Sequence, residues 1–288
     1  MRDMSAYNLR QGWAKLVQGE GALQKTAAIG LAELLGTGSI VFLGCMGCVG
    51  SMGTTPSHLQ ISITFGLAVM IVIQNFAHLS EAHVNPAITV GSVVLGRKSI
   101  PEALFYICAQ MIGAVAGYGM LKVLTPSGLL TSGRSNEGGF CATSLHSELS
   151  PIQGMLMEAS ATGLLMLLAC ALWDHRCHRS TESASIKFGL AVACLAMAVG
   201  PYTGCSMNPA RSFAPALWNL FWSHHWVYWF GPLSGAIMTA FLYRAVFSSD
   251  PEVDVEYKNS DATTKAPESI ALNSSVIVLE DLNKQEQI

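Results

Sequence analysis

The chain has 288 residues, of which 51% are hydrophobic and 12% are charged, and its formal net charge at pH 7 is −3. Its mean hydropathy of +0.40 is typical of a polytopic membrane protein and excludes an architecture built around a soluble catalytic domain. Charges are sparse in the first half of the chain: between Lys25 and Arg97 the only fully charged residues are Glu33 and Glu81.

The first 25 residues carry basic side chains at Arg2, Arg10, Lys15 and Lys25. They lack the apolar core and the cleavage site of a secretory signal peptide. We therefore expect residues 1–25 to form a cytoplasmic N-terminal segment, and membrane insertion to depend on the first apolar segment that follows.

Long apolar segments alternate with polar connections through the next part of the chain. They lie at residues 26–50, 59–78 and 101–123, and then at 151–173, 186–202 and 226–247. A helix of about 20 apolar residues is long enough to cross the hydrocarbon core of a bilayer. The pattern predicts an all-α membrane protein with six transmembrane helices in residues 26–247.

The triplet Asn-Pro-Ala occurs twice in apolar sequence, as Asn85-Pro86-Ala87 and as Asn208-Pro209-Ala210. Asparagine is a good helix N-cap and proline fits the first helical position, so each triplet predicts the start of a helix. The apolar runs that follow, Ile88 to Leu95 and Ser212 to Trp218, are too short to cross a bilayer. Irregular backbone at membrane depth is tolerated where it is packed in protein or lines a water-filled cavity. Two buried half-helices therefore indicate a pore.

The two triplets belong to an internal repeat, in which Asn208 follows Asn85 by 123 positions. Further matches in the same order are Phe65 to Val69 with Phe188 to Val192, Ala32-Glu33 with Met157-Glu158, and Gly113-Ala114 with Gly235-Ala236. Each copy, at about 26–124 and 151–247, contains three spans, so the second copy must enter the membrane from the opposite side. Inverted repeats of this kind place their broken helices near the midplane, at the interface between the copies.

The distribution of basic residues predicts the orientation. The N-terminal segment, Arg97-Lys98, the stretch from Arg176 to Lys187, and Arg244 fall on one face of a six-span arrangement, whereas Arg134 and Arg211 fall on the other. Cytoplasmic loops carry an excess of lysine and arginine, so both termini are expected in the cytoplasm.

Residues 248–288 differ in composition from the rest of the chain. They contain nine acidic residues and three lysines among many serine, threonine and asparagine residues. Segments with high net charge and few apolar residues do not bury enough surface to fold, so we expect a disordered cytoplasmic tail.

The eight cysteines fall mostly within the apolar segments, so we expect no disulfide framework. Cys45 and Cys48 lie in a glycine-rich apolar stretch, where small residues favour close helix packing. We expect no metal site and no cofactor.

Several of these motifs resemble those of the aquaporin (major intrinsic protein) family over roughly residues 26–247. They are His83-Val84-Asn85-Pro86-Ala87, the run from Gly204 through Asn208-Pro209-Ala210-Arg211 to Phe213, and the duplicated Phe-Gly-Leu. The resemblance implies passive conduction of water or small neutral solutes through one pore per subunit of a homotetramer. It implies a place in the plasma membrane, with the lipid bilayer and the permeating solutes, and not nucleic acid, as partners.

The chemistry of the motifs agrees with this function. Each half-helix brings about +0.5 of an elementary charge to the pore centre, which opposes cations and protons. Asn85 and Asn208 are expected to cap their helices with the amide oxygen and to turn the amide NH₂ toward the lumen. Arg211 stays protonated and adds a second barrier. Glu33 and Glu158, together with the pore-lining His83, are expected to support the loops before the half-helices, although intramembrane carboxylates also serve as proton relays.

The resemblance further assigns four residues to the narrow constriction on the extracellular side: Phe65, Ala196, Cys205 and Arg211. Ala196 departs from the water-selective pattern, which has histidine there, and gives the lumen more room and an apolar wall. Other markers are of the water type, namely Ser212, Ala216 and Tyr228-Trp229. This combination resembles the glycerol-permeable insect aquaporins (entomoglyceroporins), which implies passage of glycerol and urea besides water.

The sequence leaves three alternatives to this function open. The first is a water-selective aquaporin in which another side chain fills the space beside Ala196. The second is a proton-coupled transporter that uses Glu33 or Glu158, and the third is a membrane protein of cell–cell contact. An enzyme is the least favoured class, because the sequence shows no nucleophile paired with a base and no metal-binding cluster.

Overall fold

A computed structural model describes residues 21–51, 54–130, 139–177 and 183–247. Most of the expected N-terminal segment, Arg134 and the expected tail at 248–288 lie outside the described residues. Residues 21–245 form the compact unit that contains the helices discussed below.

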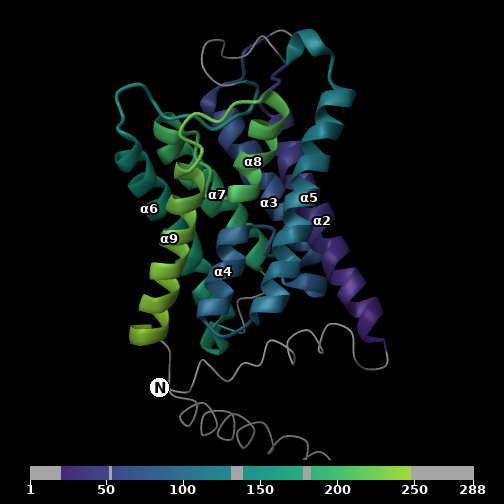
Figure 1. Ribbon diagram of the computed structural model, residues 1–288, viewed down its shortest axis with the longest axis vertical. Helices are drawn as coiled ribbons and strands as arrows, with labels where there is room; N and C mark the ends of the chain where they lie inside the picture. Colours follow the sequence, from purple (N-terminus) through teal and green to yellow (C-terminus); the bar gives the residue numbers. More distant parts are fainter. Residues whose placement is uncertain (1–20, 52–53, 131–138, 178–182, 248–288) are drawn as a thin grey trace, which may run out of the picture. The chain divides into compact units, whose positions relative to one another are not determined.

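Six long helices form the body of this unit (Figure 1). They are α2 (Ala22–Met46), α3 (His58–Ser80), α5 (Ile100–Leu124), α6 (Pro151–Trp173), α7 (Ala184–Thr203) and α9 (Val227–Leu242). A π-helical turn, Tyr243–Phe247, continues α9. All six helices are long and apolar enough to cross a membrane, which confirms the predicted all-α fold with six spans. The largest difference lies at α2, which ends at Met46 and not at residue 50, because the chain turns at Gly47 and reaches Gly50 in the left-handed region.

Two short helices, α4 (Pro86–Val94) and α8 (Pro209–Asn219), lie inside the bundle (Figure 1). Each starts at the proline of an Asn-Pro-Ala triplet, as predicted. In both, the preceding asparagine is extended and its side-chain oxygen accepts a hydrogen bond from the first turn. The two half-helices contact each other, and they also pack against helices of both repeats.

The helix pairs follow the repeat. Helix α2 packs on α5 in the first copy, α6 packs on α9 in the second copy, and α3 packs on α7 across the two copies. Glycine allows the closest approaches: a Cβ at Gly113 would meet the carbonyl of Leu34, and a Cβ at Gly235 would meet the carbonyl of Ala159. The duplicated Gly-Ala pairs therefore mark the same helix crossing in each repeat.

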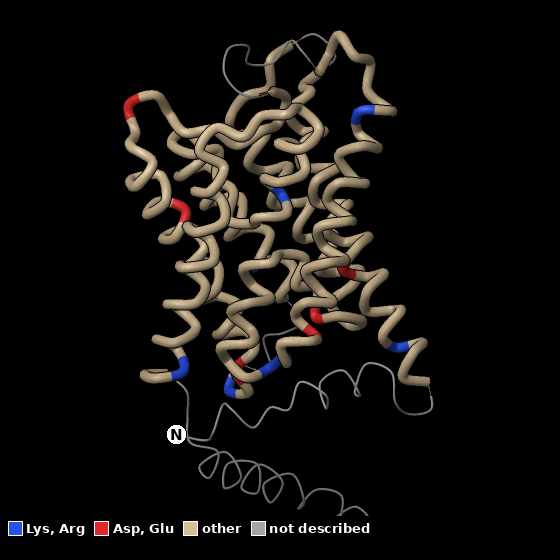
Figure 2. Tube along the Cα trace, in the orientation of Figure 1, with Lys and Arg blue, Asp and Glu red and all other residues tan. Residues whose placement is uncertain are grey.

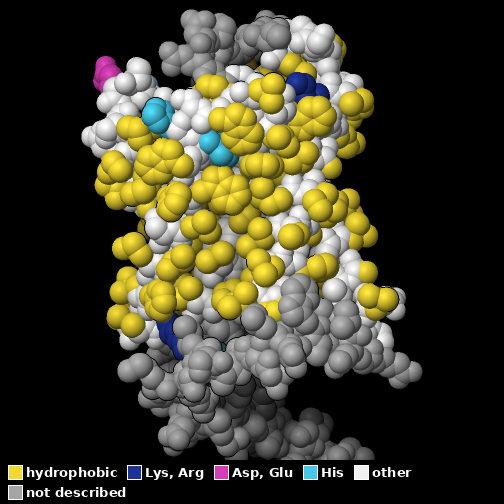
Figure 3. Space-filling model, in the orientation of Figure 1, with side chains coloured by type: hydrophobic (Ala, Val, Ile, Leu, Met, Phe, Trp, Pro, Cys, Tyr) yellow, Lys and Arg dark blue, Asp and Glu magenta, His cyan; other side chains and the backbone are white. Residues whose placement is uncertain are grey.

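The surface matches the predicted membrane location. One face of the body is covered by hydrophobic side chains between its two ends (Figure 3), and charged residues gather mainly toward the ends (Figure 2). Lys122, in the last turn of α5, lies 5.7 Å from the centre of the Trp218 ring of α8. Lys122 therefore adds a cation to the side of the membrane on which Arg134 and Arg211 were predicted to lie.

We expect Gly113→Ala to destabilise the protein by about 1–3 kcal/mol, because the new methyl group meets a backbone carbonyl and α2 must move away from α5. The thermal midpoint of the purified protein in detergent measures the effect. Gly128→Ala is the matched control, since a Cβ at Gly128 meets no atom within 4 Å. Equal midpoints for the two variants would contradict the close approach at Gly113.

Candidate functional site

A cavity of about 1450 Å³ runs between the two repeats and is lined by residues of both. Its walls include both triplet asparagines, His83, and all four residues expected at the constriction: Phe65, Ala196, Cys205 and Arg211. One end, here called the Cys141 mouth, is lined by Pro56, His58, Cys141 and His146. The opposite end, called the Glu81 mouth, is lined by Glu81, Leu172 and Trp173.

The two asparagines join the repeats at the middle of the cavity. Asn85 Oδ1 accepts a hydrogen bond from Ala87 N at 2.9 Å, and its Nδ2 donates to the carbonyl of Met207 at 2.8 Å. Asn208 Oδ1 accepts from Ala210 N at 3.0 Å, and its Nδ2 donates to the carbonyl of Val84 at 2.8 Å. Each asparagine thus caps its own half-helix and binds the residue before the other asparagine. The amide NH₂ expected to face the lumen has only one N–H remaining for a solute.

Glu33 holds the loop before α4. Its carboxylate is fully buried and accepts hydrogen bonds from the backbone N–H of His83 at 2.9 Å and of Val84 at 2.7 Å. Ser80 Oγ donates to it at 2.6 Å, and Gln110 Nε2 from α5 donates at 2.7 Å. Two backbone and two side-chain donors therefore offset the cost of burying this carboxylate.

Glu158 repeats this arrangement in the second copy. Its fully buried carboxylate accepts from the backbone N–H of Ser206 and Met207, both at 2.8 Å, and from Thr203 Oγ1 at 2.6 Å. Thr203 lies 123 positions after Ser80, so the side-chain donor is duplicated as well. Both glutamates therefore make the loop contacts expected from the sequence. Their side-chain donors Ser80, Gln110 and Thr203 were not predicted.

The loops that these glutamates hold have an unusual backbone. Ala82 and Val84 in the first copy, and Cys205 and Met207 in the second, have φ between 44° and 49°. Residues with a Cβ rarely adopt the left-handed region, and they persist there only where surrounding contacts hold them. The carboxylates bind backbone N–H groups within these same loops, so they stabilise a conformation that brings the asparagines together.

Arg211 lies on the first turn of α8, and 7% of its surface is exposed. Among the lysines and arginines that the structure describes, it is the one that is buried. Its Nη1 donates to the carbonyl of Cys141 at 2.9 Å, and its guanidinium carbon lies 4.7 Å from the centre of the Phe65 ring. Phe65 comes from α3, and its ring occupies the space that a side chain at Gly44 of α2 would need.

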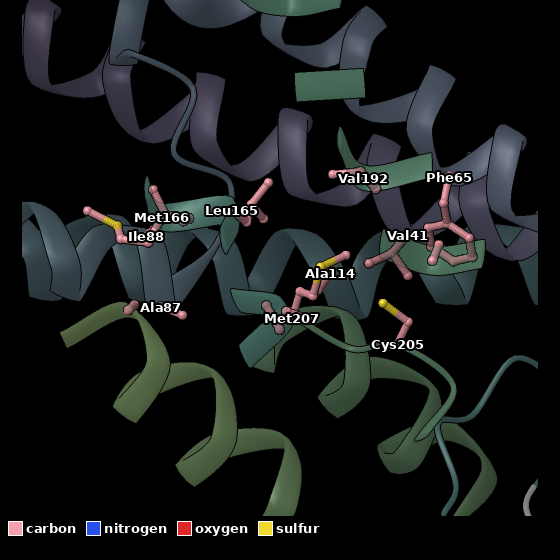
Figure 4. Packing of buried hydrophobic residues seen from close by; sticks show 14 of the residues in the cluster. Val41, Phe65, Ala87, Ile88, Ala114, Leu165, Met166, Val192, Cys205 and Met207 are labelled. Atoms are coloured by element: carbon pink, nitrogen blue, oxygen red, sulfur yellow. The ribbon is translucent and has the colours of Figure 1, made fainter. Parts of the chain in front are cut away.

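The other two residues expected at the constriction, Ala196 of α7 and Cys205 before α8, also line the cavity. In the view of Figure 4, Phe65, Val192 and Cys205 lie at one end of the buried cluster and Ile88 and Met166 at the other. Cys205 Sγ lies 3.4 Å from the carbonyl of Leu195, next to Ala196 in the chain.

A histidine does line the cavity near Ala196, but it comes from a different helix. His58 is the first residue of α3, and its Nε2 lies 3.1 Å from the carbonyl of Met197. Its ring would meet a Cβ at Gly200, one turn beyond Ala196. Because seven residues of helix separate His58 from Phe65, about 10 Å along the axis, His58 belongs to the Cys141 mouth and not to the level of the Phe65 ring.

The cysteine prediction is wrong at one pair. Cys45, at the end of α2, forms a disulfide with Cys141 in the connection between α5 and α6. The sequence favoured helix packing as the reason for Cys45 and predicted no disulfide framework among the eight cysteines. The apolar segment around Cys45 gave no signal for its partner Cys141, which lies 96 residues further along the chain.

Glu81 at the opposite mouth was also missed as a site residue. It has φ of 66°, and its carboxylate contacts Lys98 Nζ at 2.8 Å and Arg97 Nη2 at 3.0 Å. Burial alone would raise the pKa of the Glu81 carboxyl, but the hydrogen bonds and charges of Lys98 and Arg97 outweigh it and lower that pKa. An acidic residue two positions before the histidine of the first motif was the signal available in the sequence.

Two half-helices that meet at their N-termini between two repeats are typical of membrane transport proteins. The family model for the major intrinsic protein matches residues 23–243. The chain is 36% identical to Aquaporin-4 of Mus musculus over 253 residues, which cover 88% of this chain and 73% of that protein. It is 38% identical to Aquaporin-2 of Bos taurus over 216 residues, which cover 75% of this chain and 77% of that protein.

The chain therefore belongs to the major intrinsic protein family, and it is a multi-pass membrane channel and not an enzyme. Its fold is also similar to the X-ray structure of the aquaglyceroporin from Plasmodium falciparum, with a TM-score of 0.69 and 24% sequence identity. That match covers 80% of this chain and 99% of the other, and it bears on the fold alone.

Glu158→Gln tests the loop support. An amide keeps one acceptor oxygen but turns its NH₂ toward backbone N–H donors, so we expect a loss of about 1–3 kcal/mol in stability and a lower water permeability. Thermal unfolding in detergent and water flux in vesicles measure both effects. Glu148→Gln is the control because Glu148 is exposed; equal behaviour of the two variants would contradict a supporting function for Glu158.

Proposed function

We propose that the protein conducts water, glycerol and urea passively, and that it excludes protons and other ions. The observation that carries the proposal is the lining of the cavity beside Arg211, where Ala196 provides a small apolar wall. A glycerol molecule can place its carbons against Ala196 and Phe65 while its hydroxyl groups accept hydrogen bonds from the guanidinium of Arg211.

Exclusion of ions is supported by two sources of positive charge. The N-termini of α4 and α8 meet in the cavity, and each contributes about +0.5 of an elementary charge. Arg211 adds a full charge at the constriction, where burial makes its field stronger than it would be in water. The several hydrogen bonds that Glu33 and Glu158 accept from the loops favour structural functions over proton relay.

The second candidate is a water-selective channel. It is favoured by the water-type residues Ser212, Ala216 and Tyr228-Trp229. Ser212 and Tyr228 are buried away from the lumen: Ser212 Oγ donates to Ser206 Oγ at 2.6 Å, and Tyr228 has no exposed surface. We give more weight to Ala196 because it is among the residues that line the cavity, whereas none of these four residues is.

The proposal includes orientation and assembly. Disulfides persist in oxidising compartments, so Cys45–Cys141 favours a Cys141 mouth that faces the cell exterior. Arg97 and Lys98 at the Glu81 mouth favour the cytoplasm on the other side, by the excess of basic residues in cytoplasmic loops. We further propose a homotetramer in the plasma membrane, to be tested by native mass spectrometry and by surface labelling of intact cells.

Stopped-flow light scattering on liposomes that contain the purified protein tests the solute range directly. We expect water and glycerol permeabilities well above those of empty vesicles. Fast water flux with background glycerol flux would favour the water-selective channel and overturn this part of the proposal.

We expect Ala196→His to reduce glycerol permeability at least tenfold while water permeability changes less than threefold, because the imidazole narrows the constriction and replaces an apolar wall. Ala198→His is the matched control, since Ala198 is an exposed alanine on the same helix. An equal loss of both fluxes in Ala196→His would show that the substitution damages the fold and does not act on selectivity.

Cys205 provides a test of the constriction by chemical block. A mercurial on its thiol, which lines the cavity, should stop water flux, and Cys205→Ser should restore most of that flux in the presence of the reagent. Water permeability before and after the reagent measures the effect. Full inhibition of Cys205→Ser would assign the block to another thiol, and Cys48 is the next candidate because it also lines the cavity.

A further inference from the structure

Three cysteine sulfurs lie together at the Cys141 mouth. Cys45 and Cys141 form the disulfide, and the Sγ of Cys48 lies 3.8 Å from the Sγ of Cys141. Cys48 follows Cys45 by one helical turn, with its backbone N–H bound to the carbonyl of Cys45 at 3.0 Å. Cys45 and Cys48 therefore both face Cys141, which lies in the connection between α5 and α6.

We infer that these residues form a thiol–disulfide exchange site, in which Cys141 pairs with either Cys45 or Cys48. The thiolate of Cys48 attacks Cys141 Sγ, the Cys48–Cys141 bond forms, and the Cys45–Cys141 bond breaks. Cys45 leaves as a thiolate and takes up the proton that Cys48 lost. The numbers of thiols and disulfides do not change, so the step needs no oxidant or reductant.

The surroundings favour this attack. Cys48 is half-buried and lines the cavity, so its sulfur lies beside the aqueous path and not in lipid. The thiolate is the form of cysteine that attacks a disulfide, and contact with the cavity favours its formation more than burial in lipid would.

The exchange would act on the constriction through one hydrogen bond. Cys141 holds the guanidinium of Arg211 through its own carbonyl, at 2.9 Å from Nη1. When Cys141 changes its sulfur partner from Cys45 to Cys48, its sulfur moves toward the Cys48 sulfur, which lies 3.8 Å away, and we expect the attached carbonyl to shift with it. The two disulfide forms would therefore hold Arg211 in two positions, a consequence that rests on the proposed channel function.

The unaltered chain provides the first test, because cyanogen bromide cleaves after Met46 and separates Cys45 from Cys48. The purified protein is incubated at neutral pH, quenched in acid, denatured, and alkylated with N-ethylmaleimide before cleavage. Exchange predicts label on both the Cys45 fragment and the Cys48 fragment, with Cys141 disulfide-linked to each. Label on Cys48 and none on Cys45 would overturn the exchange site, and a Cys45–Cys48 link would overturn the assigned attack on Cys141.

Two variants isolate the two forms. Cys45→Ser should contain a Cys48–Cys141 disulfide, whereas Cys48→Ser should keep Cys45–Cys141; Cys194→Ser, on the exposed face of α7, controls for removal of a cysteine. Two alkylatable thiols at Cys48 and Cys141 in monodisperse Cys45→Ser would overturn the exchange.

Water flux in vesicles then tests the effect on the constriction, and we expect at least a twofold difference between the two locked forms. Equal flux would overturn control of the constriction by the disulfide. These outcomes are independent of glycerol passage, since they are read from peptide masses and from water flux.

Discussion

The reciprocal hydrogen bonds of Asn85 and Asn208 are the contact on which the rest of the structure depends. Each side chain caps one half-helix and binds the backbone of the loop before the other, so neither loop has its full set of partners alone. The two repeats therefore complete each other at the centre of the membrane. Glu33 and Glu158 make this possible, because each buried carboxylate gathers the N–H groups of one loop whose backbone includes left-handed residues.

The centre of the channel is symmetric, whereas the proposed constriction is not. At the centre, equivalent residues of the two repeats make equivalent contacts. At the proposed constriction the symmetry is lost, because the Phe65 ring, the Ala196 methyl group and the Arg211 guanidinium come from three different helices. The carbonyl that holds Arg211 comes from a connection outside the repeat pattern, at Cys141.

The sequence was sufficient for the spans, the half-helices and the placement of both glutamates, because hydrophobic length, helix caps and a 123-residue offset are local or periodic signals. It was insufficient where a contact depends on how the chain returns in space. The Cys45–Cys141 disulfide joins a span to an irregular connection that has no periodic pattern. Gln110 is a single polar residue on an apolar helix, and its bond to Glu33 follows only from the packing of α5 on α2. The second partner of each asparagine lies in the other repeat, beyond any local motif.

The side chain of Ala196 lies on the wall of the cavity and takes no part in the hydrogen bonds around Asn85, Asn208, Glu33 and Glu158. A change at this position therefore alters the lumen without removing a contact that the fold requires. In evolutionary terms, the wall of the lumen at this position can change through a single codon, while the supporting framework stays under separate selection.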